Sequence, residues 1–165
     1  MKIPILHLPE GFQRFEEIIK PGTLHFYRQE VYPAAIQAVA EVNKFQKNIR
    51  CRVSLRTTAH HACDRCLEAF AIPCECAFEL LFHIGKEDLQ TEEEDVVLLA
   101  PETAEVDLAE WIVEQLILSI PMKLLCREDC QGICPGCGAN LNQEACRCGE
   151  KPGDPRWEKL RELLK

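Results

Sequence analysis

The sequence has no stretch of about 18 consecutive apolar residues, the length that a membrane-spanning helix needs. Its start, M-K-I-P-I-L-H-L-P, has too short an apolar run and too many prolines for a secretion signal. Positive charge is also scarce, because 19 Lys and Arg stand against 27 Asp and Glu and leave a net charge of −8. We therefore expect a cytoplasmic protein, and not one that coats nucleic acid indiscriminately.

Common catalytic motifs are missing as well. The sequence has no Gly-rich phosphate loop, no nucleophile elbow and no paired-histidine metal motif. Its 165 residues, 47% apolar and 28% charged, suffice for one ordinary core and a small appendage. The prediction is a globular protein that is not an enzyme.

Cysteine, by contrast, is abundant. The chain has 11, an odd number arranged mainly in CxxC-type pairs, which argues against a disulfide framework. Six of them lie in C-R-E-D-C-Q-G-I-C-P-G-C-G-A-N-L-N-Q-E-A-C-R-C, residues 126–148. The spacing predicts one tetrahedral zinc site, and rubredoxin-like iron and a redox dithiol remain alternatives. Its expected ligands are Cys134, Cys137, Cys146 and Cys148.

The pair Cys63 and Cys66, in C-D-R-C, has three interpretations: half of a zinc site, a redox dithiol, or two turn cysteines. Cys126 and Cys130 lack two partners, so adding the first pair would complete a second four-thiolate site. Alternatively, one zinc ion uses some of the six tail thiolates and leaves the first pair free. The cofactor prediction is therefore one or two Zn²⁺ ions.

Two segments show the period of two that is typical of strands. Residues 50–56 alternate arginine or serine with apolar residues, and residues 70–82 alternate in the same way. We place the Cys63–Cys66 pair on their connection, and favour a strand over a helix for residues 35–43. The cysteines on the apolar faces of these strands are expected in the core: Cys51, Cys74 and Cys76.

Two helices are expected after the strands. The first begins at Asp107, with Glu110 completing a capping-box-like start, and ends before Pro121. The second begins at Asp154-Pro155 and carries an apolar stripe of Trp157, Leu160, Leu163 and Leu164. The predicted class is α+β, with a mostly antiparallel β-sheet body and one packed core helix in residues 1–121. A Cys-rich zinc-binding tail with a C-terminal helix follows in residues 122–165.

Charge is unevenly distributed along the chain. A basic strip is a candidate surface for RNA phosphates, and the alternative is that its arginines pair with the chain's own carboxylates. The tail offers Arg127, Arg147 and Lys151 as a second contact surface, while the acidic residues 87–95 suggest a solvated loop. His60 and His61 are read as exposed loop residues rather than ligands or RNA contacts. The strip comprises Lys44, Lys47, Arg50, Arg52, Arg56 and Arg65.

Several motifs together resemble the YceD family, a domain of unknown function named for large ribosomal RNA subunit accumulation. They are C-D-R-C-L-E-A-F, the I-L-S-I-P that ends the first predicted helix, C-x3-C-x-G-x-C-P-x-C-G-A-N-L-N, the following C-x-C, and D-P-R-W. The resemblance covers the chain from about residue 45 and implies a bacterial-type cytoplasmic assembly or stability factor. Other members of the family keep the first cysteine pair and lack the tail cysteines, which implies that metal is not the family's chemistry.

Two functions follow as hypotheses. The first is a ribosome-assembly factor that contacts large-subunit ribosomal RNA or the pre-ribosomal particle through the basic strip. The second is an acidic escort that holds a basic ribosomal protein with residues 87–95 and the final helix. A thiol redox role would require accessible dithiols of low pKa.

Overall fold

The computed structural model describes residues 1–24, 31–85 and 96–149. The chain forms two compact units. The first comprises Met1–His61 and Phe70–Met122, and the second comprises Ala62–Ala69 together with the chain from Lys123 onward. The second unit thus begins one residue after the predicted tail boundary of 121/122, and it also includes the loop that carries Cys63 and Cys66.

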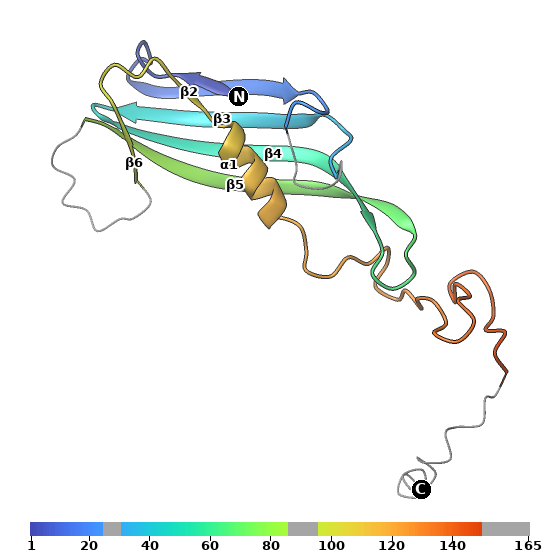
Figure 1. Ribbon diagram of the computed structural model, residues 1–165. Coiled ribbons are helices and arrows are strands. Elements are labelled where there is room, and N and C mark those ends of the chain that lie inside the picture. The colour runs from blue at the N-terminus through green and yellow to red at the C-terminus, as the bar shows by residue number, and fades with distance from the viewer. Residues whose placement is uncertain (25–30, 86–95, 150–165) are drawn as a thin grey trace, which may run out of the picture. The chain divides into compact units, whose positions relative to one another are not determined.

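The first unit is built on a five-stranded sheet in the order β2-β3-β4-β5-β6, whose four long strands lie side by side in Figure 1. β2 (Gly11–Ile19) pairs antiparallel with β3 (Ile36–Phe45), which pairs antiparallel with β4 (Asn48–Ala62). β5 (Ala69–Ile84) pairs in parallel with β6 (Val96–Leu99). Two short strands, β1 (Lys2–Pro4) and β7 (Glu105–Asp107), form a separate antiparallel pair.

The alternating apolar residues explain which face of this sheet is buried. In β4, Cys51, Val53 and Leu55 are each at most 1% exposed, whereas the arginines and serine between them are exposed. The helix α1 (Ala109–Leu118) contributes Ile112 and Leu116 to the same buried cluster. The three strands expected at 35–43, 50–56 and 70–82 are confirmed as β3, β4 and β5. Among the three strand cysteines, Cys51 is buried, while Cys74 and Cys76 are partly buried against the core.

The predicted α+β class is wrong. Strands make up most of the regular structure in the described residues, with one ten-residue helix, and the sheet is mixed because β6 runs parallel to β5. The predicted packed core helix is therefore one short element in a mostly β chain, and the predicted C-terminal helix lies outside the described residues. No helix within the described ranges is long and apolar enough to cross a membrane.

The predicted start of the first helix is also wrong. Asp107 ends β7, and Leu108 is the N-cap residue, with no side-chain hydrogen bond from it to the helix. The Asp107 carboxylate instead accepts a hydrogen bond from the Ala109 N–H at 3.0 Å. The Asp107 side chain therefore accepts from the N–H group two residues ahead, as in a local turn. The Asp107–Glu110 spacing is that of a capping box, but Asp107 is not the N-cap residue.

Candidate metal centres

Two groups of four cysteines each bring their sulfur atoms together in the second unit. The loop site consists of Cys63, Cys66, Cys126 and Cys130, and the tail site consists of Cys134, Cys137, Cys146 and Cys148. Within each site all four Sγ atoms lie within 4.8 Å of one another. These are the two groupings that cysteine spacing suggested.

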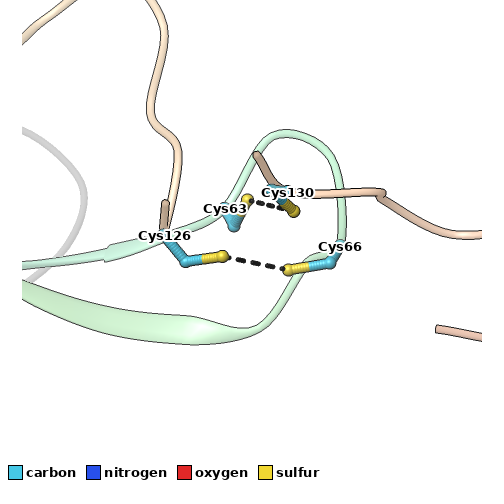
Figure 2. Close-up of side chains that lie close together, drawn as sticks. All are labelled: Cys63, Cys66, Cys126 and Cys130. Carbon is cyan, nitrogen blue, oxygen red and sulfur yellow. Dashed lines mark hydrogen bonds between the residues drawn. The ribbon is translucent and has the colours of Figure 1, made fainter. Parts of the chain in front are cut away.

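The distances between the sulfur atoms suit a bound ion better than disulfides. In the loop site Cys63 Sγ lies 3.8 Å from Cys130 Sγ, and Cys66 Sγ lies 3.7 Å from Cys126 Sγ (Figure 2). In a tetrahedral site with Zn–S bonds of about 2.3 Å, neighbouring sulfurs are about 3.8 Å apart. All of these cysteines are free, and a disulfide would need an S–S distance of about 2.05 Å.

The tail site has a similar, slightly less regular arrangement. Cys134 Sγ lies 3.3 Å from Cys146 Sγ and 3.6 Å from Cys148 Sγ, and Cys137 Sγ lies 4.0 Å from Cys146 Sγ. A tetrahedral set of four thiolates is typical of zinc and of iron. The residues of both sites therefore fit a thiophilic metal ion, and the distances do not discriminate between these two metals.

Both CxxC pairs adopt the same backbone knuckle. The carbonyl of Cys63 accepts the Leu67 N–H at 2.8 Å, and that of Cys134 accepts the Gly138 N–H at 2.8 Å. The first cysteine of each pair also donates its N–H to the carbonyl five residues ahead, at 2.9 Å and 2.8 Å respectively. The residue four positions after that cysteine is left-handed in both knuckles, with φ of 61° at Leu67 and 75° at Gly138.

The left-handed residue that both knuckles share can be tested by substitution at each site. Gly138→Ala should weaken metal binding at the tail site roughly fivefold, because a side chain at positive φ costs about 1 kcal/mol. A Cβ on Gly138 would meet no heavy atom within 4 Å, so the effect would come from the backbone alone. Leu67→Gly is the matched change at the loop site, where the exposed Leu67 already bears this strain. We expect Leu67→Gly not to weaken metal binding. Chelator competition measures the metal affinity of both variants. An equal loss of affinity in the two variants would contradict the shared backbone geometry.

Hydrogen bonds to the sulfurs lower the pKa of two thiols in each site, Cys63 and Cys130 in the loop site and Cys134 and Cys137 in the tail site. Burial raises the pKa of the Cys63 thiol, but hydrogen bonds from backbone N–H groups, led by that of Cys126, outweigh burial and lower it to about 6. The backbone N–H groups of Cys137 and Gly136 lower the pKa of Cys134 to about 6 as well. One thiolate in each site is thus available near neutral pH.

Other thiols in the same sites resist ionisation. Burial, followed by the neighbouring thiols of Cys66 and Cys130, raises the pKa of Cys126 to about 12. Hydrogen bonds with the Cys134 and Cys137 thiols likewise raise the pKa of Cys148 to about 12. Four negative charges within one site repel one another, and a bound divalent cation would remove that penalty.

Few apolar side chains are buried in the described part of the second unit. Within its described residues the buried hydrophobic side chains are Ala139 and four of the cluster cysteines, Cys63, Cys66, Cys130 and Cys134. The apolar burial in this described part is too small to offset its loss of chain entropy. Metal ligation is the usual means by which segments of this kind fold.

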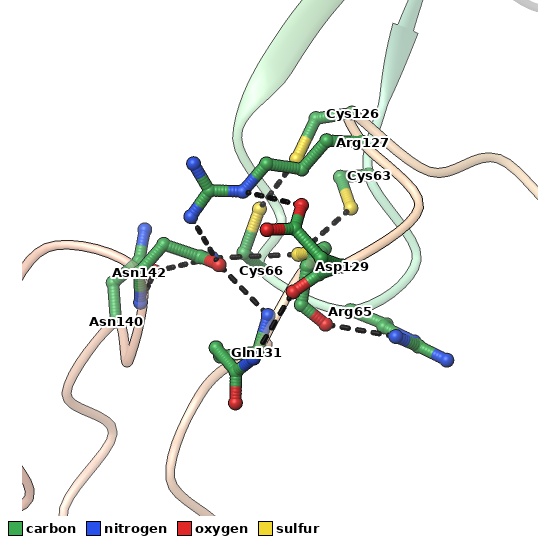
Figure 3. A network of polar contacts seen from close by, with 10 residues as sticks. Cys63, Arg65, Cys66, Cys126, Arg127, Asp129, Gln131, Asn140 and Asn142 are labelled. Atoms are coloured by element: carbon green, nitrogen blue, oxygen red, sulfur yellow. Dashed lines mark hydrogen bonds and ion pairs between the residues drawn. The ribbon is translucent and has the colours of Figure 1, made fainter.

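A polar network surrounds Asn142 beside the loop-site cysteines (Figure 3). Asn142 Nδ2 donates to Cys130 Sγ at 3.4 Å, while Asn142 Oδ1 accepts from the Arg127 guanidinium and from the Gln131 N–H, each at 2.7 Å. Arg65 Nη1 donates to the Cys130 carbonyl at 2.8 Å. The contact of Asn142 with Cys130 was not predicted from the sequence, where the available signal was an N-L-N tripeptide between two cysteine pairs.

The Arg65 backbone also explains a glycine between the two sites. The Arg65 carbonyl accepts the Ile133 N–H at 3.1 Å, and a Cβ on Gly132 would lie 3.1 Å from that oxygen. Gly132 has a φ of 76°, a region in which a side chain is strained. The segment after Cys130 can therefore approach the loop of Cys63 closely because position 132 has no side chain.

The predicted basic strip is not gathered on one surface. Arg50 and Arg56 lie on the exposed face of β4 and pair with Glu79 at 2.8 Å and Glu75 at 3.5 Å, both on β5. Arg52 lies opposite Glu41 in the strand register.

The other strip residues lie elsewhere. Lys44 Nζ donates to the Leu8 carbonyl, Lys47 follows β3, and Arg65 belongs to the second unit. In the tail, Arg127 pairs with Asp129 at 3.4 Å and Arg147 pairs with Glu144, while Lys151 lies outside the described residues. Neither His60 nor His61 belongs to a four-cysteine site, and the ring of His61 lies 6.3 Å from that of Phe70.

Comparisons with known proteins place the chain in a family. Residues 51–164 match the family described as large ribosomal RNA subunit accumulation protein YceD. An uncharacterised protein of Mycobacterium tuberculosis is 38% identical over 104 residues, covering 62% of this chain and 49% of the relative. The chloroplastic large ribosomal RNA subunit accumulation protein YCED homolog 1 of Arabidopsis thaliana is 27% identical over 154 residues, covering 78% of this chain and 48% of the relative.

The chain thus spans about half the length of the curated relatives it matches. No solved structure matches it. The family match includes both CxxC knuckles and all eight cysteines of the loop and tail sites. The resemblance inferred from the sequence is confirmed, and the chain belongs to the YceD family.

Proposed function

We propose that the protein is a non-enzymatic factor that supports accumulation of large-subunit ribosomal RNA during ribosome assembly. We further propose that structural zinc in the loop site and the tail site folds its second unit. The observation that carries this proposal is the family match over residues 51–164, together with the name of the Arabidopsis relative, a large ribosomal RNA subunit accumulation protein. We propose that the protein acts in the cytoplasm, the compartment in which a bacterial-type ribosome is assembled.

The ligand sets support a structural rather than a catalytic role for the metal. Each site supplies four cysteine sulfurs, which fill the four positions of a tetrahedral zinc ion. A catalytic zinc site keeps one position for water or substrate, and neither set of four leaves such a position. The metal would supply folding free energy and hold two segments distant in sequence, residues 62–69 and 123–149, together.

Direct contact with RNA is the leading mode of action. The arginines of β4 are exposed, and exposed ion pairs contribute at most about 1 kcal/mol, so RNA phosphates can replace the carboxylates of Glu75 and Glu79 as partners. Arginine is well suited to such contacts because its guanidinium can bind phosphate oxygens in a bidentate manner.

An escort function is the second candidate, and a groove beside α1 favours it. The groove is mainly apolar and carries two exposed carboxylates, Glu110 and Glu114, on consecutive turns of the helix. Such a surface fits an amphipathic basic segment of a ribosomal protein, with apolar side chains in the groove and Lys or Arg beside the carboxylates. The lining residues are Thr23, Leu24, Ala109, Glu110, Val113, Glu114, Ile117 and Leu118.

Charge reversal separates the two modes. Changing Arg50, Arg52 and Arg56 to Glu should weaken binding to large-subunit RNA fragments at least tenfold, because three phosphate contacts are lost. Filter binding at one fixed salt concentration measures this effect. The matched variant Glu110→Lys/Glu114→Lys changes charge on a different element and should leave RNA binding unchanged. If the arginine variant binds RNA normally while the glutamate variant loses a co-purified ribosomal protein, the escort function replaces RNA contact.

A further inference from the structure

The loop site and the tail site are connected by a short paired segment, which we call the shared ribbon (residues 130–134 and 138–142). One side of the ribbon begins at Cys130, a loop-site ligand, and ends at Cys134, a tail-site ligand. The Cys134 N–H donates to the Ala139 carbonyl at 2.8 Å, and the Leu141 N–H donates to the Gly132 carbonyl at 2.9 Å. An isolated antiparallel bridge between Ile133 and Asn140 lies between these two hydrogen bonds.

The returning side of the ribbon (residues 138–142) carries Asn142, whose side-chain amide contacts the loop site. Asn142 lies between Cys137 and Cys146 in sequence, so it belongs to the connection that the tail-site ligands close. Its Nδ2 nevertheless donates to the Sγ of Cys130, a loop-site sulfur, at 3.4 Å (Figure 3). The tail site's own connection thus supplies a hydrogen-bond donor to the sulfur of the neighbouring site.

Local contacts hold the Asn142 side chain in this orientation. Its Oδ1 accepts from Arg127 and from the Gln131 N–H, and its Nδ2 also donates to Asn140 Oδ1 at 2.8 Å. The Asn142 N–H donates to the same Asn140 oxygen at 3.0 Å. Groups that hydrogen-bond a metal ligand tune its affinity for the metal, and their loss typically costs 10–100-fold.

We infer that the two metal sites load cooperatively, because metal in the tail site fixes the shared ribbon and presents Asn142 to the Cys130 sulfur of the loop site. Thermodynamic linkage requires the reverse as well, so metal in the loop site strengthens binding in the tail site by the same factor. Asn142 is a positioning residue in this scheme and is not itself a ligand. The inference rests on the metal sites of the proposed function.

Native mass spectrometry of metal-free, reduced protein given one equivalent of Zn²⁺ tests the inference. The wild type should show mainly metal-free and two-zinc chains, with the one-zinc form in the minority. Asn142→Asp should make the one-zinc form dominant and weaken the second binding step at least tenfold. Asp keeps an oxygen acceptor for Arg127 and the Gln131 N–H but cannot donate to the Cys130 thiolate. Asn142→Ala, which removes donor and acceptor together, should show the same redistribution.

Glu144→Gln provides the matched control, because Glu144 lies in the same connection, is exposed and pairs through its side chain with Arg147. That variant should load like the wild type. A dominant one-zinc form in the wild type, or an unchanged distribution in both Asn142 variants, would overturn the coupling and leave the two metal sites standing. Failure of the wild type to take up zinc would contradict the coupling and the metal part of the proposed function together.

Discussion

Replacing Cys63 and Cys66 together with serine should at least halve the metal content of the purified protein, from two ions per chain to at most one. The loop site would lose two of its four ligands, while the tail site would keep all four. The change should also expose the second unit to proteolysis, because the buried side chains in its described part are mostly the ligands themselves. Metal analysis and limited proteolysis are the measurements, and metal analysis also decides between zinc and iron.

The control for this variant is Cys74→Ala/Cys76→Ala. These two cysteines lie on β5 in the first unit and belong to neither site, so the protein should keep two metal ions. Cys137→Ser/Cys148→Ser should likewise leave at most one ion, and the two double changes combined should leave none. Undiminished metal content after the Cys63/Cys66 change would mean that the loop site holds no ion. A loss in the β5 control would mean that the effect is not specific to the ligands.

The second large effect should appear in ribosomal RNA. In cells that lack the native protein, the ratio of large-subunit to small-subunit ribosomal RNA should be low, and the wild-type chain should restore it. The Cys63→Ser/Cys66→Ser variant should leave the ratio at the level of the deletion, because the loop site that it removes lies within the family match. Quantitative RNA analysis at matched protein levels measures the ratio.

Protein level is the decisive control in that experiment, since a partly unfolded chain can be degraded and lose function for that reason alone. The Cys74→Ala/Cys76→Ala variant should restore the ratio. Full restoration by the loop-site variant would contradict a role for metal in the function, even if metal binding itself were established.

Part of the fold could be predicted because one sheet face is buried and the other is not. The alternation of Cys51, Val53 and Leu55 with polar residues is a direct consequence of this, and it predicted β4. The same reasoning could not find β1, since a strand of three residues is too short to show a period. Nor could it show that β6 runs parallel to β5, because periodicity has no direction.

The α+β prediction failed because it counted two helices beside a mostly β body, whereas the described residues contain one short helix. Ile112 and Leu116 are buried as a helical stripe requires, but α1 is only ten residues long. Fold class depends on how many residues lie in strands and how many in helices. The nine-residue strand β2, which was not predicted from the sequence, adds to the strand content.

The grouping of the cysteines was more predictable than the fold class, because cysteines that could hold one metal ion recur at short, typical spacings along the chain. Cysteine spacing indicated two groups of four, with a single tail site as the alternative, and the structure brings Cys63 and Cys130 together across 67 positions. Asn142 could not be predicted, because its contact with Cys130 depends on the pairing of the shared ribbon. Similarly, alternation placed Arg50 and Arg56 on one face but could not reveal that β5 brings carboxylates beside them.

The most direct test of the central claim is ultraviolet crosslinking of the tagged protein in cells, with sequencing of the attached RNA and identification of co-purified proteins. We predict crosslinks concentrated in large-subunit ribosomal RNA or its precursor, reduced by the arginine reversal in β4. Absence of these crosslinks together with recovery of a basic ribosomal protein would replace RNA contact by escort. Absence of both would contradict a direct role in assembly of the large subunit.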